Sequence, residues 1–179
     1  MKEIKFNLGG IGQGGEYTTV NLAEICDIKA DIMNLNSFCD DNSVDEFFLS
    51  HTLEHIPVTE YKKFLLHMKE KLKKGGKIRV VQTDVGRLIN MWFNGEICFR
   101  SMRTPIFTPA TRCKSNSLQQ HQNMWSEEEL IKDFISIGMQ AEGFDAHFWE
   151  YDVEDDMLPE ETEKDYGKHI PNLGVIATK

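Results

Sequence analysis

Strand-like and helix-like hydrophobic patterns alternate along the whole sequence, and this feature constrains the fold more than any other. Such alternation is typical of an α/β fold with a mainly parallel sheet. The apolar run at 44–50 is expected to be a buried central strand. Strands are expected at residues 4–8, 17–22, 27–33, 44–50, 77–83, 140–145 and 173–178, and helices at 59–72, 85–93 and 126–137.

Glycines and one serine mark the expected helix ends. Gly75 and Gly76 are expected to end the helix at 59–72, and Gly138 the helix at 126–137. Ser126 opens that last helix with a capping box. Residues 94–124 form a long polar stretch, and its prolines argue against regular structure there.

The composition indicates one globular domain. Of the 179 residues, 40% are hydrophobic and 27% are charged. We expect a single domain over 1–179, with a substrate-side insertion at about 95–124 and an acidic loop at about 150–166. The net charge of −9 is concentrated in that loop, because residues 150–165 hold nine acidic residues and one lysine. The acidic balance argues only weakly against nucleic acid as a partner, since a basic surface could coexist with the loop.

Membrane and export signals are missing from the sequence. No apolar run approaches the roughly 20 residues that span a bilayer, and the first residues show no apolar leader. We therefore expect a cytoplasmic protein with reduced thiols. The cysteines are Cys26, Cys39, Cys98 and Cys113.

A glycine cluster follows the first expected strand, at the edge of the sheet where α/β folds bind ligands. Glycines at 9, 10 and 12 allow a tight turn and bring backbone N–H groups close to a ligand. A nucleoside bound there needs a polar group after the second strand for its ribose and one after the third for its base. Asn21 or Glu24 could fill the first role and Asp31 the second. Alternatively, Asp31 caps a turn and Asn21 ends a strand.

Several segments together resemble the class I S-adenosylmethionine-dependent methyltransferases, most closely their small predicted members. The resemblance covers residues 4–84, and its most specific parts are Ser50-His-Thr-Leu-Glu-His-Ile56 and Leu72-Lys-Lys-Gly-Gly-Lys-Ile78. It implies a Rossmann-like three-layer sandwich with a mostly parallel seven-stranded sheet and an antiparallel last strand. It also implies S-adenosylmethionine as cofactor and methyl transfer to an unidentified acceptor.

The resemblance assigns cofactor contacts position by position. Gly9, Gly10 and Gly12 would face the methionine end of S-adenosylmethionine. Asn21 and Leu22 would lie at the ribose, Asp31 and Ile32 at the adenine, and Ser50 and His51 beside the reactive methyl.

Two positions depart from the family pattern: Ile11 stands where a glycine is usual, and Asn21 stands where an acid is usual. An amide makes no charge-assisted hydrogen bond to a hydroxyl. A non-catalytic nucleotide- or cofactor-binding protein that retains the fold is therefore the alternative function. A nicotinamide-dependent oxidoreductase is disfavoured, because no clean G-x-G-x-x-G leads into a helix.

Histidines supply the candidate bases, with His51 first and His121 second. His51, Glu54 and His55 also match H-x-x-E-H, the inverted zinc-protease signature. That motif needs both histidines in one helix, whereas His51 directly follows a buried strand and Pro57 follows closely. We therefore expect no metal site.

The segment 97–126 contains no Asp or Glu but several basic and aromatic residues. Arg100 and Arg103 are the candidate acceptor-binding cations, because the guanidinium fork suits phosphate and carboxylate groups. Trp125 could line the acceptor pocket. We expect an acceptor with negative charge or many hydroxyls, and the alternative is a plain surface loop.

Overall fold

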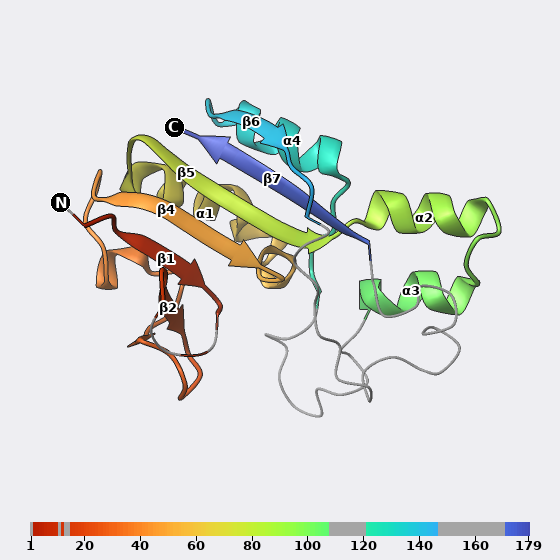
Figure 1. Ribbon diagram of the computed structural model, residues 1–179, viewed down its shortest axis with the longest axis horizontal. Coiled ribbons are helices and arrows are strands. Elements are labelled where there is room, and N and C mark those ends of the chain that lie inside the picture. Colours follow the sequence, from red (N-terminus) through yellow and green to blue (C-terminus); the bar gives the residue numbers. More distant parts are fainter. Residues whose placement is uncertain (1, 11, 13–14, 108–120, 147–170) are drawn as a thin grey trace.

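The computed structural model describes residues 2–10, 12, 15–107, 121–146 and 171–179 (Figure 1). Its strands are β1 (Lys5–Leu8), β2 (Thr18–Asn21), β3 (Ile28–Lys29), β4 (Val44–Ser50), β5 (Leu72–Thr83), β6 (Gln140–Gly143) and β7 (Asn172–Thr178). Its helices are α1 (Val58–Lys71), α2 (Val85–Phe93), α3 (Phe99–Phe107) and α4 (Glu127–Ser136), with the 3₁₀ turns η1 (Leu35–Ser37) and η2 (Leu53–His55). None of the helices within these ranges is long and apolar enough to cross a bilayer.

The seven strands form one sheet in the order β3-β2-β1-β4-β5-β7-β6. All neighbouring pairs from β3 to β5 are parallel, and β7 runs antiparallel to both β5 and β6. This topology confirms the predicted class I methyltransferase-type fold. The strand order reverses between β1 and β4, because β2 and β3 lie on one side of β1 while β4 and β5 lie on the other. The carboxyl ends of β1 and β4 therefore define the crevice where open α/β sheets bind ligands.

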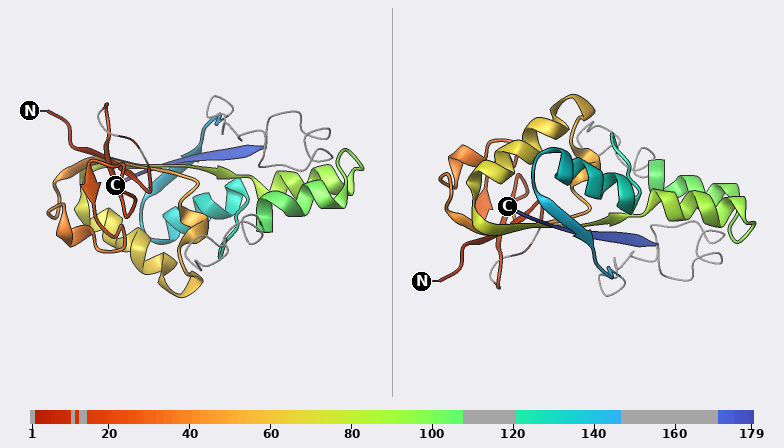
Figure 2. Two further views of the ribbon diagram at one scale, coloured as in Figure 1. Left: turned by 90° about the horizontal axis from the view of Figure 1, so that it is seen from below. Right: turned by 90° about the horizontal axis from the view of Figure 1, so that it is seen from above.

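The main core lies between the sheet and the helices α1 and α4. Phe47 and Leu49 of β4 are fully buried against Phe64 and Met68 of α1 and Phe134 of α4. Each such side chain contributes about 1.5 to 3 kcal/mol when it is removed from water. Figure 2 shows both helices on the same side of the sheet.

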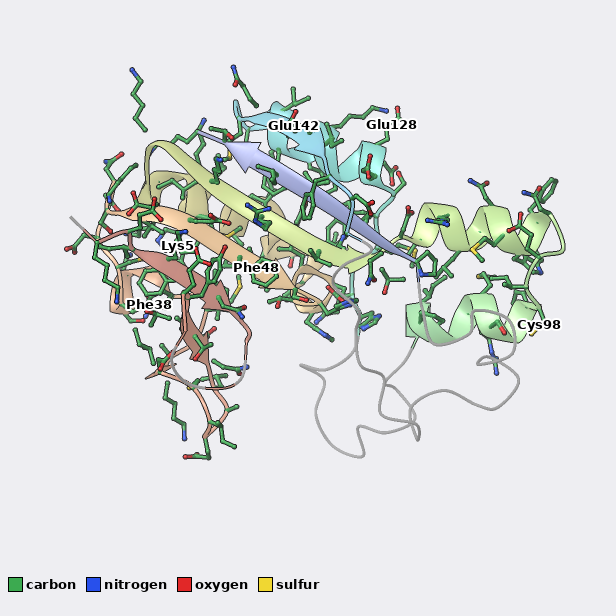
Figure 3. The ribbon with its side chains drawn as sticks, viewed as in Figure 1. Lys5, Phe38, Phe48, Cys98, Glu128 and Glu142 are labelled. Atoms are coloured by element: carbon green, nitrogen blue, oxygen red, sulfur yellow. The ribbon has the colours of Figure 1, made fainter. Side chains whose placement is uncertain are left out.

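The opposite face carries no helix in the described ranges, so these residues do not show the expected third layer. Polar and apolar groups share this face: Glu46 accepts hydrogen bonds from Arg79 Nε at 2.9 Å and from the Tyr17 hydroxyl at 2.8 Å, and Phe48 and Val81 form a small buried cluster. Figure 3 shows Lys5 and Phe48 here, turned away from α1 and α4. The connections 9–17 and 22–27 are also shorter than the roughly dozen residues of a helical crossover.

The end of α1 differs from the expectation. The helix ends at Lys71, and Gly75 and Gly76 lie inside β5 rather than capping the helix. Leu72 is fully buried and pairs with Val44 in the β4–β5 ladder, so the strand begins five residues earlier than the expected start at Lys77. Gly75 still has a left-handed backbone, with φ of +79°, but as a turn within the strand.

The expectation of irregular structure at 94–124 is wrong for its first part, because α3 forms there despite Pro105 in its interior. Met102 and Ile106 of α3 pack against Val85 and Leu88 of α2, and this burial outweighs the loss of one backbone hydrogen bond. The two helices form a hairpin that projects beyond the carboxyl end of β5, with Cys98 at its far end (Figures 1 and 3).

Other local expectations are confirmed. Ser126 caps α4 by accepting a hydrogen bond from Glu129 N at 3.3 Å, and Gly138 closes the helix with φ of +76°. Cys39 is a free, half-buried thiol. Cys113 and the acidic stretch 150–165 lie outside the described residues.

Candidate functional site

The loops after β1 and β4 interlock at the crevice where the strand order reverses. Gly9 follows β1 with φ of +82°, and a Cβ on it would lie 2.6 Å from Oγ1 of Thr52. This hydroxyl is within hydrogen-bond distance, 3.0 Å, of the carbonyl oxygens of both Leu8 and Ser50. Position 9 therefore requires glycine for two reasons, the left-handed backbone and the close approach of Thr52.

Asn21, at the end of β2, holds the glycine loop in place. Its Nδ2 donates to the carbonyl oxygens of Gly9 at 2.7 Å and Gly10 at 3.3 Å, and its Oδ1 accepts from Ala23 N at 3.2 Å. Gly12 has φ of +106°, and a Cβ on it would meet no atom within 4 Å. The Asn21 amide thus holds the loop directly. Gly12 is held by its own backbone, since its N–H donates to Ile25 O at 2.9 Å and its carbonyl oxygen accepts from the Thr19 hydroxyl at 2.7 Å.

The residues expected at the ribose and adenine come after β2 and β3. Leu22 is 55% exposed, which is unusual for a leucine next to a buried strand. The exposed Asp31 accepts a hydrogen bond through Oδ1 from Met33 N at 2.9 Å, so it caps a turn. A carboxylate has further acceptor sites for a ligand. Ile32 packs against the core, and Glu24 forms an ion pair with Lys29.

His51 follows β4 in a left-handed conformation with φ of +48°. A non-glycine residue in this region costs of order 1 to 3 kcal/mol, and such strain concentrates at functional sites. The backbone N–H of His51 donates to Val81 O at 2.9 Å, and its Nδ1 lies 3.3 Å from Oε1 of Glu54. The carboxylate therefore orients the imidazole of the first candidate base.

Glu54 is a charged residue in the protein interior, only 5% exposed. Burial raises the pKa of Glu54, but the hydrogen bond and charge of His51 outweigh burial and lower this pKa below its ordinary value. The carboxylate is therefore ionised at neutral pH. Its backbone is also fixed, because Gln122 N donates to Glu54 O at 2.6 Å.

His121, the second candidate base, lies against Glu54 and His55. The rings of His55 and His121 are 5.0 Å apart, edge to face. His121 Nδ1 lies 3.1 Å from Ile106 O, and a carbonyl only accepts, so Nδ1 carries the proton and Nε2 keeps its lone pair. Burial lowers the pKa of His121, so this imidazole is neutral at pH 7.

A small pocket opens between these residues and the α2–α3 hairpin. Its lining comprises Glu54, Gln82, Thr83, Val85, Pro105, Ile106, His121, Asn123, Met124 and Trp125. Trp125 lines this pocket, but it is 6% exposed and donates from Nε1 to Asp133 at 3.0 Å. It forms a wall of the pocket and part of the core.

Arg103 is not among the described residues that line this pocket. Arg100 lies on the first turn of α3, at the far end of the hairpin, and its side chain is outside the described part. Arg103 is exposed on the same helix. Among the described side chains of α3, Pro105 and Ile106 line the pocket.

Sequence reasoning missed Thr52 and Gln82 and did not connect Glu54 with His121. Gln82 is 2% exposed near the end of β5, where it interrupts an apolar run. A polar residue in such a run is a signal that could have been found in the sequence. The approach of Thr52 to Gly9 links residues 43 positions apart, so no local pattern could show it.

Comparison with solved structures finds methyltransferases of the same fold. A SAM-dependent methyltransferase from Archaeoglobus fulgidus is 13% identical with a TM-score of 0.57, and the match covers 99% of this chain and 86% of that one. The 1,6-didemethyltoxoflavin-N1-methyltransferase of Burkholderia thailandensis, solved with S-adenosylhomocysteine, is 10% identical with a TM-score of 0.56, covering 99% and 72%. A SAM-dependent methyltransferase from Thermotoga maritima is 17% identical with a TM-score of 0.54, covering 98% and 82%.

These identities are low, so the likeness shows the fold alone. The chain has the fold of the class I S-adenosylmethionine-dependent methyltransferases. No protein-family model and no curated protein matches the sequence.

Proposed function

We propose that this protein transfers the methyl group of S-adenosylmethionine to an acceptor nucleophile. The observation that carries the proposal is the interlocked pair of loops at the crevice between β1 and β4, in a sheet with the methyltransferase strand order. Only glycine fits at position 9, because Thr52 lies against it, so the two loops form one preformed edge.

The residues around this edge fit the cofactor. A side chain at Gly12 would meet no described atom within 4 Å, so a ligand can approach the loop there, although the Gly12 N–H itself donates to Ile25 O at 2.9 Å. The exposed side chain of Leu22 gives an apolar surface for the nucleoside. Asp31 keeps acceptor capacity for an adenine amine beside its turn-capping bond. Asn21 holds the loop and can offer its oxygen to a ribose hydroxyl.

S-adenosylmethionine would supply an electrophilic methyl group on a good leaving group. The chain then has to position the acceptor, and alignment alone can supply much of the rate. Ser50 ends β4 and His51 follows it at the crevice, where the methyl is expected. His51, oriented by Glu54, is the candidate to take the acceptor proton.

Binding of S-adenosylhomocysteine, the demethylated product, tests the cofactor site. We expect it to raise the melting temperature, because a ligand that binds only the native state stabilises it. Asp31→Ala should weaken binding by about 1 to 3 kcal/mol, measured by calorimetry, if the carboxylate accepts a bond from adenine.

The matched control is Asp40→Ala, which removes an exposed carboxylate from the loop before β4, at the opposite end of that strand from the crevice. If the Asp31 and Asp40 variants bound S-adenosylhomocysteine equally well, Asp31 would serve only to cap its turn. No stabilisation of the folded protein at millimolar ligand would contradict the cofactor assignment. Tight binding without release of S-adenosylhomocysteine from S-adenosylmethionine, over a panel of acceptors, would favour the non-catalytic alternative.

A further inference from the structure

Three potential metal ligands meet beside the crevice. Glu54 and His55 belong to the turn η2 after β4, and His121 comes from the segment that leads into α4. Each offers one ligand atom, and these atoms all lie within 4.8 Å of one another. His121 is more than 60 positions away in sequence, so the H-x-x-E-H pattern does not describe this cluster.

Buried polar atoms without a partner point to a ligand here. Oε2 of Glu54, Nδ1 of His55 and both amide atoms of Gln82 are buried, and in the described part of the chain none of them has a hydrogen-bond partner. Glu54 and Gln82 line the same pocket as His121. Burying an unpaired carboxylate oxygen is costly, and a cation between these groups would satisfy it.

The cluster is held rigidly from outside. Nδ1 of His121 donates to Ile106 O, which directs its Nε2 lone pair away from that carbonyl. Metal-binding histidines are held in this way, with the second ring N–H on a carbonyl or carboxylate. The next residue, Gln122, donates from N to Glu54 O at 2.6 Å and from Nε2 to His55 O at 3.2 Å. These bonds fix His121 against η2.

We propose that Glu54, His55 and His121 bind one divalent transition-metal ion of the zinc class. Two imidazole nitrogens and one carboxylate oxygen form the ligand set of open zinc sites, which keep one position for water or substrate. Magnesium and calcium prefer ligand sets made only of oxygen. The space that a water-sized particle can occupy in the adjoining pocket is about 10 Å³, room for roughly one water or ion.

This site is distinct from the pairing of His51 with His55 that the motif suggested. His51 lies at the end of β4, outside any helix, and its Nδ1 is directed to Oε1 of Glu54. Through this contact His51 orients the Glu54 carboxylate, as hydrogen-bonding groups around a metal ligand do. The proposal needs no cofactor and does not depend on methyl transfer.

Zinc binding to the chelator-treated protein tests the proposal. We expect one Zn²⁺ per chain by calorimetry, a rise in melting temperature, and d–d absorption typical of four coordination when Co²⁺ replaces Zn²⁺. His121→Gln and His55→Gln should each weaken Zn²⁺ binding by at least about tenfold. The control His67→Gln removes a histidine of α1 outside the cluster and should leave binding unchanged.

Circular dichroism of each variant separates loss of the site from loss of the fold. If His121→Gln unfolds, the Co²⁺ spectrum of the unmodified protein and the His55→Gln variant decide. Absence of stoichiometric Zn²⁺ binding to the folded protein would overturn the proposal. So would equal losses in the His67 and His121 variants, or stabilisation by Mg²⁺ and not by Zn²⁺.

Discussion

Replacing Gly9 by alanine probes the interlock between the loops after β1 and β4. The left-handed backbone, with φ of +82°, costs alanine about 1 to 2 kcal/mol. The new Cβ would also lie 2.6 Å from Oγ1 and 2.9 Å from Cγ2 of Thr52. Forcing a methyl group into filled space costs about 1 to 3 kcal/mol. We therefore expect Gly9→Ala to lower the free energy of unfolding by about 2 to 5 kcal/mol.

The chain offers a matched control for the backbone contribution. Gly75 has a similar φ of +79°, but a Cβ there would meet no atom within 4 Å. Gly75→Ala should therefore cost only the backbone contribution, about 1 to 2 kcal/mol. Urea unfolding followed by tryptophan fluorescence gives both values.

A double-mutant cycle isolates the contact itself. Thr52→Ala removes Oγ1 and Cγ2 and leaves a Cβ at 3.3 Å from the alanine methyl. In that background Gly9→Ala should cost little more than Gly75→Ala does, so the two changes couple by about 1 to 3 kcal/mol. If Gly9→Ala is no more costly than Gly75→Ala in the unmodified protein, the loops do not interlock as described.

Two further outcomes are expected. The hydrogen bond from Lys73 lowers the pKa of Asp45, so this carboxylate stabilises the fold above its ordinary pKa of about 3.9, and the effect is lost as the pH falls through the lower folded pKa. Asp45→Asn should therefore lower the melting temperature more at pH 7 than at acidic pH; an equal difference at both would contradict this. Replacing Arg100 and Arg103 together by alanine should weaken binding of an anionic or hydroxyl-rich acceptor without changing cofactor affinity, with a loss that shrinks as salt rises. If the double variant instead lowered the affinity for the cofactor, α3 would act as a lid and not as an acceptor-binding element.

The order and type of most elements could be predicted because each leaves a local pattern. The apolar run at 44–50 and the serine cap at Ser126 depend on neighbours within a few residues, and both are confirmed. The end of α1 could not be predicted in this way. Leu72 has good helical spacing, but its pairing with Val44 across the sheet decides its conformation. Helix α3 likewise forms through packing against α2, which no local rule about proline reflects.

The candidate site was predicted in part for the same reason. Gly9 and His51 follow predicted strands, so the topology alone places them at one edge of the sheet. The contacts that define the site join residues distant in sequence. Thr52 lies against Gly9, and His121 lies close to Glu54. The H-x-x-E-H motif pairs His51 with His55, whereas the cluster contains His55 and His121. Sequence spacing cannot show this contact, because it joins residues more than 60 positions apart.

The segment 50–56 connects the two proposed sites and explains the strained backbone of His51. On one side Thr52 fixes the segment against Gly9 in the cofactor crevice, and on the other Glu54 O accepts the N–H of Gln122 beside the metal ligands. His51 lies between these two anchors with φ of +48°, and its own N–H is bound to Val81 O. A residue held on three sides cannot relax to a more favourable backbone without breaking one of those contacts. The strain is therefore maintained by both sites together, and it directs the imidazole of His51 to the carboxylate that the proposed metal would share.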